Sequence, residues 1–216
     1  MIARSPRNVK SSRAYDASRR REQARQAHSR IIDAAERMFL RDGYSATTVH
    51  AIADAAGVSA DTIYKSFGGK PGLIRAIRDR ALAGEGPVPA EQRSDEIQQR
   101  ESDARTILGA WGAFVAELAP RGAPILLLIR DAAATDAGVR ALRDELAADR
   151  LKRMTDNARR LRDAGHLRHG ISLAHAADIL WSYSSPELYE LLVIRRGWTP
   201  DRYGRFVADA MISALL

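Results

Sequence analysis

Residues 43–67 read GYSATTVHAIADAAGVSADTIYKSF, and this stretch decides how the chain folds. Apolar residues recur every three or four positions in its first part, which predicts a short helix capped by Thr47. Gly57 supplies a left-handed turn after that helix, and Ser59 is placed to cap a second short helix. Two short helices joined by a three-residue turn that contains glycine have the spacing of a helix-turn-helix.

Helical periodicity continues on both sides of this stretch. Upstream, residues 31–42 carry an apolar face that ends before Gly43, and downstream Gly68 and Gly69 break the chain before a further helix. Strand patterns are nearly absent, and the fold class is therefore all-α, with an N-terminal three-helix domain joined to a larger C-terminal helical domain. The later helices are predicted at residues 94–118, 124–134, 137–164, 173–183, 186–196 and 200–216.

Composition and the positions of prolines set the predicted domain boundaries. Residues 1–25 are rich in Arg and Ser and poor in large aliphatics, which predicts a flexible arm. The helix-turn-helix domain with its connecting helix occupies residues 26–83, a linker with two prolines occupies 84–93, and the second domain occupies 94–216.

The positive charge of the chain is concentrated at its N-terminus. Residues 1–30 hold nine Arg and Lys against two Asp and Glu, so they account for the formal charge of +7 of the whole chain. The arm is either a solvated tail or a segment that follows DNA phosphates or the minor groove. A membrane-surface anchor would need bulky apolar residues that the arm lacks.

The helix-turn-helix stretch resembles the TetR family of transcriptional regulators. The match rests on the Gly-Tyr pair, the paired threonines, Ile-Ala, Ala-Gly-Val-Ser, and Thr-Ile-Tyr before a Phe, and it extends roughly over residues 31–77. The resemblance implies that the second short helix enters the major groove of DNA. The DNA-contacting residues that it implies are Thr48, Ser59, Ala60, Asp61, Thr62, Tyr64, Lys65 and Lys70. By contrast, Ile63 and Phe67 should face inward.

Two positions depart from the family pattern. Asp61 stands where a small neutral residue is more usual, and its carboxylate would either accept from a cytosine amino group or stabilise the start of its own helix. Residues 69–71 read Gly-Lys-Pro in place of Ser-Lys-Glu, which still suits a helix start and leaves Lys70 as an expected phosphate contact.

The resemblance also implies what the second domain does. It implies a pocket for a small-molecule effector and a homodimer formed by the last long helices, so that the ligand releases a repressor from a palindromic operator. A regulator that is ligand-independent or activating is the alternative. The expected dimer residues are Ala177, Leu180, Trp181, Phe206, Val207, Ala210, Met211 and Ala214. The expected pocket residues are Trp111, Phe114 and Tyr183.

Other functions find little support in the sequence. Cysteine is absent, which removes disulfides and thiolate chemistry, and the spacing of His166, His169 and His175 matches no metal motif. No catalytic motif is present, so a helical enzyme is disfavoured, and neither a metal nor a cofactor is expected. The longest aliphatic run, residues 125–129, is too short to span a bilayer, and a cytoplasmic protein without a membrane partner is expected.

Overall fold

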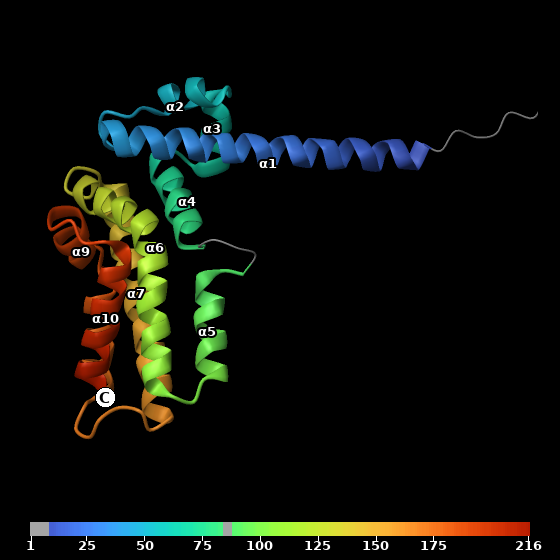
Figure 1. Ribbon diagram of the computed structural model, residues 1–216. Coiled ribbons are helices and arrows are strands. Elements are labelled where there is room, and N and C mark those ends of the chain that lie inside the picture. The colour runs from blue at the N-terminus through green and yellow to red at the C-terminus, as the bar shows by residue number, and fades with distance from the viewer. Residues whose placement is uncertain (1–8, 84–87) are drawn as a thin grey trace, which may run out of the picture. The chain divides into compact units, whose positions relative to one another are not determined.

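The computed structural model describes residues 9–83 and 88–216, and every regular element in these ranges is a helix (Figure 1). The all-α prediction is therefore confirmed. The elements are, in chain order, α1 (Val9–Asp42), α2 (Val49–Ala56), α3 (Ala60–Phe67), α4 (Lys70–Ala83), α5 (Ala90–Arg100), α6 (Ala104–Ala132), α7 (Ala137–Asp163), α8 (Leu173–Tyr183), α9 (Pro186–Tyr189), the π-helix η1 (Glu190–Arg195) and α10 (Pro200–Leu215).

The first helix is longer than the sequence indicates. Residues 9–25 belong to the expected flexible arm, yet the structure continues α1 through them to Val9. Arg and Ala make up eight of its seventeen residues, and both have high intrinsic helix propensity, which a search for apolar periodicity overlooks. Residues 1–8 of the predicted arm lie outside the described residues.

The chain divides into two compact units at Leu73, inside α4, rather than at the predicted linker. The later part of α4 belongs to the second unit because its side chains interact there. The Arg75 guanidinium forms an ion pair with Glu145, and Leu82 lies where a Cβ on Gly122 would meet it at 2.9 Å. Within the predicted linker, α5 begins at Ala90, and residues 84–87 lie outside the described residues.

In the first unit, α1 and α3 pack with α2 around a small apolar core. The side chains of Phe39, Ile52 and Ile63 are completely buried, and the Phe39 ring stacks on Tyr44 with centroids 5.5 Å apart. Ile63 therefore faces inward as predicted. Phe67 is only half-buried, and its ring stacks on His28 of α1 at 4.6 Å.

The second unit is a helical bundle (Figure 1), and α6 and α10 pack against each other more extensively than any other pair of its helices. The two helices touch through glycines, since a Cβ on Gly112 would lie 2.5 Å from the Gly204 carbonyl oxygen. A Cβ on Gly204 would in turn lie 2.6 Å from the carbonyl oxygen of Gly112. Both positions are buried, so glycine here allows backbones to meet where larger residues would separate them.

The helix boundaries around α6 differ from the prediction. Residues 94–118 form parts of two helices, because the chain breaks after α5 and α6 begins anew. Asp103 caps α6, and its carboxylate accepts a hydrogen bond from the Thr106 amide at 2.8 Å. Conversely, α6 continues through Pro120 and Pro124, where a new helix was expected at residue 124. Burial of Gly122, Ala123 and Ile125 in the bundle offsets the hydrogen bonds that the prolines remove.

Within the described residues, one helix is long and apolar enough to cross a membrane by length and composition, namely α6. Its length exceeds the aliphatic run of residues 125–129 considered above. Core helices of bundles meet the same criterion, and Leu108 and Ile125 of α6 are completely buried within the protein.

Candidate functional site

The start of α2 is fixed by two adjacent threonines with different tasks. Thr48, not Thr47, is the N-cap, and its side-chain oxygen accepts a hydrogen bond from the Ala51 amide at 3.1 Å. Thr47 is buried and donates its hydroxyl to the Gly43 carbonyl at 2.8 Å. The cap prediction was thus wrong by one residue, because the hydroxyl of Thr47 is taken up by the preceding turn.

The turn between α2 and α3 is built as predicted. Gly57 has φ +66°, in the left-handed region, and the Val58 amide donates to the Ala53 carbonyl at 3.0 Å. Ser59 caps α3 by accepting from the Thr62 amide at 3.2 Å, and its hydroxyl lies 2.9 Å from that of Thr62. These local contacts fix the direction in which α3 leaves the turn.

The outer face of α3 presents polar and charged side chains to solvent. Asp61, Tyr64 and Lys65 are exposed, and the Lys65 ammonium forms an ion pair with the Asp61 carboxylate at 2.7 Å, one turn away. Asp61 therefore stands in the first turn of its own helix and is paired with Lys65. Such an exposed pair stabilises a helix by about 0.3–0.5 kcal/mol. Ser59 is also exposed, while Ala60 and Thr62 are half-buried.

Lys70 lies differently from the expectation. Its half-buried ammonium donates to the carbonyls of Tyr44 at 2.7 Å and Thr47 at 3.0 Å, and it sits 4.1 Å from the centre of the Tyr44 ring. These hydrogen bonds tie the start of α4 to the segment before α2. Carbonyl oxygens and an aromatic face together attract the ammonium more than open solvent does.

Two contacts from α1 that the sequence analysis missed hold the helix-turn-helix. The Arg30 side chain donates to the Ala56 carbonyl at 3.3 Å, at the C-terminal end of α2, and His28 stacks on Phe67 as described above. Both residues lie just after the predicted arm of residues 1–25, where no local pattern marks them. On the same helix, Arg19, Arg20 and Arg21 are exposed.

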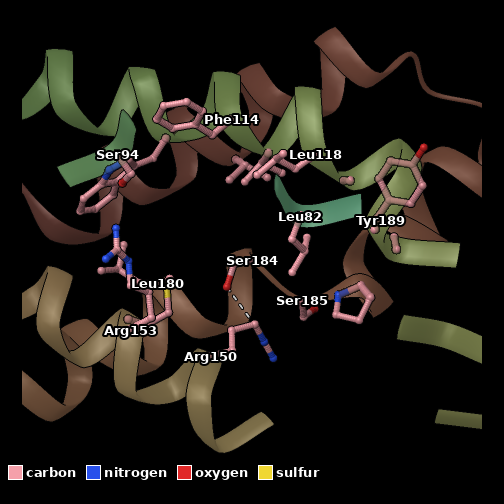
Figure 2. A pocket seen from close by; sticks show the side chains of 18 of the residues that line it. Leu82, Ser94, Phe114, Leu118, Arg150, Arg153, Leu180, Ser184, Ser185 and Tyr189 are labelled. Atoms are coloured by element: carbon pink, nitrogen blue, oxygen red, sulfur yellow. Dashed lines mark hydrogen bonds between the residues drawn. The ribbon is translucent and has the colours of Figure 1, made fainter. Parts of the chain in front are cut away.

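The second unit contains a cavity of about 230 Å³. Its walls are mostly apolar, and in Figure 2 Phe114 and Leu118 of α6 line one side while Arg150 and Ser184 line the opposite side. The expected pocket residues Trp111 and Phe114 both line this cavity. Tyr183 does not line it, because its ring instead packs edge-on against Phe206 at 6.4 Å.

Half of the expected dimer residues are buried inside a single chain. Ala177, Leu180, Val207 and Met211 are at most 4% exposed and belong to the core of the second unit, so they do not form an outer dimer face. Leu180, Val207 and Met211 line the cavity instead. For these four residues the prediction is wrong, because an apolar stripe on a helix marks a buried face without telling whether the same chain or a partner covers it.

Arg150 of α7 is the charged residue that sequence reasoning missed at the cavity. One terminal nitrogen of its guanidinium, Nη1, donates to the Ser184 hydroxyl at 2.9 Å and to the Trp181 carbonyl, and the guanidinium lies 4.5 Å from the centre of the Trp181 ring (Figure 2). Burial lowers the pKa of Arg150, although an arginine in a protein stays protonated. Its position in a charge-rich helix offers no local signal that would separate it from its neighbours.

Two tyrosines complete the cavity wall beside this cation. The rings of Tyr189 and Tyr203 pack edge-on at 5.5 Å, and both residues are buried. Burial raises the pKa of each phenol above its ordinary value, and at Tyr203 the nearby Arg150 opposes the rise. Both phenols are therefore neutral donors and acceptors near neutral pH.

Metal ligands are not gathered anywhere in residues 9–83 and 88–216. No three His, Asp or Glu side chains come together there in a way that could hold an ion. His169 and His175 are exposed, and His166 is half-buried.

The family model of bacterial regulatory proteins of the tetR family matches residues 31–77, which contain α2, α3 and the turn between them. Over these residues the chain is similar to the tetR family. The matched residues coincide with the extent of the resemblance inferred above. The chain is 34% identical over 139 residues to the transcriptional regulatory protein RaaS of Mycobacterium tuberculosis, an alignment that covers 64% of the chain and 57% of RaaS. The chain spans less than two thirds of the length of the curated relatives it matches.

Solved structures extend the likeness to the fold of both units. The SmeT–triclosan complex superposes with a TM-score of 0.65 at 22% identity and covers 88% of this chain and 91% of SmeT. NalD of Pseudomonas aeruginosa, the secondary repressor of the MexAB-OprM multidrug efflux pump, gives a TM-score of 0.70 at 19% identity, over 89% of the chain and 98% of NalD. RaaS is a transcriptional regulatory protein and NalD is a repressor.

Proposed function

We propose that the chain is a DNA-binding transcriptional regulator whose α3 reads the major groove. The carrying observation is the outer face of α3, where the exposed side chains of Ser59, Tyr64 and Lys65 project from a helix held by caps at both ends. A rigid short helix with hydroxyl, phenol and ammonium groups matches the donors and acceptors on base edges and phosphates. Ala60, Asp61 and Thr62 complete the face that would meet the bases.

Phosphate contacts are assigned to the edges of this face. Thr48 is exposed at the N-terminus of α2, and its hydroxyl proton is available because the oxygen acts as acceptor in the cap. Backbone amides at that helix start favour an anion as well. Lys70 acts one step removed, since it holds the backbone of Thr47 and so orients the Thr48 cap beside it.

We assign the cavity of the second unit to a small-molecule effector, and the outer face of α10 to a homodimer. Phe206, Ala210 and Ala214 recur at four-residue steps and are at least partly exposed, as is Trp181 on α8. Such a row is the part of the expected dimer face that the core of the single chain does not cover. SmeT, a neighbour in fold, is known in complex with triclosan, which supports a small organic effector here.

In this scheme two recognition helices in a cytoplasmic dimer read a palindromic operator, and the effector shifts the population toward a conformation that releases it. Repression is favoured over activation because NalD, which shares the fold, is a repressor. A regulator that ignores ligands, or that activates, is the competing scheme. Neither scheme requires a cofactor.

Selection of duplex DNA from a random library, followed by fluorescence anisotropy with the full chain, tests DNA binding. Tyr64→Phe should weaken binding to all selected duplexes alike, whereas Thr62→Ala should change the preferred bases, at about 1–3 kcal/mol for one well-placed contact. The matched control is Tyr183→Phe, which removes the same hydroxyl in the second unit. Failure to enrich any duplex, or equal loss in the control, would contradict the assignment.

Sedimentation of the Phe206→Glu variant tests the dimer. A carboxylate placed in an apolar face that a partner covers is costly, so we expect a monomer where the unchanged chain is a dimer. Glu187→Gln, an exposed site on α9, serves as the control and should sediment as the unchanged chain does. A dimer that survives the charge at Phe206 would move the interface elsewhere.

A further inference from the structure

The cavity of the second unit contains a cation whose hydrogen-bonding capacity is only partly used. A guanidinium carries five N–H donors, and Nη1 of Arg150 spends its two on the Ser184 hydroxyl and the Trp181 carbonyl. Across the described residues neither Nε nor Nη2 forms a hydrogen bond, and no carboxylate forms an ion pair with this arginine. Glu187 affects it only through a longer-range electrostatic interaction.

The open edge has a definite shape. Nε and Nη2 present two parallel N–H groups, and this edge of a guanidinium binds the two oxygens of a carboxylate side by side. The hydrogen bonds from Nη1 and the ring of Trp181, 4.5 Å away, hold the guanidinium in one orientation. Half-buried and oriented before any ligand arrives, the cation loses little freedom on binding.

A second donor at the cavity also lacks a partner. The indole nitrogen Nε1 of Trp111 is buried and has no hydrogen-bond partner in the described structure, and Trp111 is only 7% exposed. Buried polar groups in native proteins are nearly always satisfied, and this indole N–H is not. Both unmet groups are donors, which favours an acceptor-rich ligand.

The other charged side chains of the cavity do not compete for that ligand. Arg153 forms an ion pair with Asp95 at 2.9 Å, and Glu91 is exposed on α5. The remaining lining is largely apolar, with Leu82, Leu118 and Met154 among its members. A ligand that fits therefore has an apolar body and one acidic group.

We propose that the cavity binds a small amphipathic carboxylate and that Arg150 holds its carboxyl group through Nε and Nη2. This inference rests on the proposed effector role of the cavity and names the chemical class of the effector. The carboxylate pairs with the half-buried guanidinium, and the apolar chain fills the space between α6 and α7. A neutral or cationic amphiphile of equal length lacks the ion pair with Arg150.

The test compares octanoate, octan-1-ol and octylamine by calorimetry on the full chain without DNA. Octanoate should bind about 10- to 100-fold more tightly than octan-1-ol, the range for a charge-assisted hydrogen bond, and octylamine should bind most weakly. Because the unchanged protein is used, this comparison does not depend on the folding of any variant. Equal binding of the acid and the alcohol, tighter binding of the amine, or binding of none of the three would overturn the proposal.

Variants then assign the preference to a residue. Arg150→Met should bring the ratio of octanoate to octan-1-ol affinities close to one, whereas Arg153→Met, which removes the paired arginine of the same cavity, should leave it unchanged. If Arg150→Met does not fold because Trp181 and Ser184 lose their donor, Arg150→Lys is used, and its ratio should fall severalfold as the fork is lost. A preference that persists undiminished in these Arg150 variants would refute the role of Arg150.

A separate measurement keeps this inference apart from the proposed function. Octanoate is added to the complex of the chain with its selected DNA, and release is followed by anisotropy. If octanoate binds through Arg150 but the DNA is not released, the carboxylate site stands and the effector-release mechanism fails. If the chain binds no DNA, the calorimetric result is unaffected.

Discussion

The helix-turn-helix and the cavity place their functional groups in opposite ways. In the first unit, the caps of α2 and α3 are made by residues three positions away, and the groups proposed to function point outward. In the second unit, the hydrogen bonds of Arg150 join residues more than thirty positions apart, and the proposed site is enclosed by core residues. An exposed recognition helix can thus be formed by local hydrogen bonds, whereas an internal site forms only when helices distant in sequence pack together.

This difference has an energetic side. The helix-turn-helix unit has a small core, so removal of one core side chain takes away a large share of its buried contacts. The larger bundle of the second unit tolerates a cavity because other contacts hold its helices together.

Ile63→Ala should damage the first unit most. Ile63 is completely buried between α3 and the rest of a small core, and loss of a buried isoleucine side chain costs about 2–5 kcal/mol. Urea unfolding followed by circular dichroism measures the change. Leu40→Ala on α1, a residue that is 48% exposed, is the control and should cost less than about 0.5 kcal/mol. Equal costs at the two positions would show that α3 does not rest on this core.

Gly112→Ala tests the long-range packing of the second unit. The new Cβ would lie 2.5 Å from the Gly204 carbonyl oxygen and 2.7 Å from the Ala208 Cβ, so α6 and α10 must separate at a cost of about 1–3 kcal/mol. Gly109→Ala on the same helix has nothing within 4 Å and should stabilise the protein by about 0.5–1 kcal/mol. Opposite signs in thermal unfolding are expected, and a shared sign would contradict the close helix crossing.

The same contrast explains what the sequence could predict. The turn at Gly57, the cap at Ser59 and the inward position of Ile63 follow from conformational and capping preferences over a few residues, and the structure contains all three. The exposed polar face of α3 followed for the same reason. Errors in this region were small, as with Thr47 and Thr48, where neighbouring hydroxyls are chemically equivalent until the preceding turn selects one.

The second unit could be predicted only in part. Periodicity located the helices of residues 137–163 and 200–215 well, but it did not reveal that α6 passes through two prolines or that Val207 faces the cavity. Arg150 gave no signal, because its significance lies in a carbonyl and a hydroxyl from a different helix. Tertiary contacts between distant segments decide such positions, and one sequence does not encode them locally.

Ser59→Ala should have a smaller effect than either core change. The variant removes the acceptor for the Thr62 amide, and loss of such an N-cap costs about 1 kcal/mol. Ser66→Ala is the control, since Ser66 is exposed within α3, and alanine there should be neutral or slightly favourable. Unfolding without DNA measures both variants. A Ser59→Ala protein as stable as the control would show that α3 does not depend on its local cap.

Asp95→Asn is expected to have the smallest effect, and one that depends on pH. Burial alone would raise the pKa of Asp95, but hydrogen bonds from Arg153 and Arg160 outweigh it and hold the pKa below that of an ordinary aspartate. A lowered folded-state pKa contributes stability above the unfolded value of about 3.9, and the contribution disappears as the pH falls through the folded-state pKa. The variant should therefore be less stable by at most about 1 kcal/mol near neutrality, as for a partly exposed ion pair, and the difference should vanish in acid.

Asp144→Asn, whose pair with Arg143 is more exposed, is the control in urea unfolding at several pH values and should change stability by less than about 0.5 kcal/mol. A difference between Asp95→Asn and the unchanged chain that grows toward low pH would reverse the assigned sign. In that case α5 would be held to α7 by contacts other than this long-range ion pair.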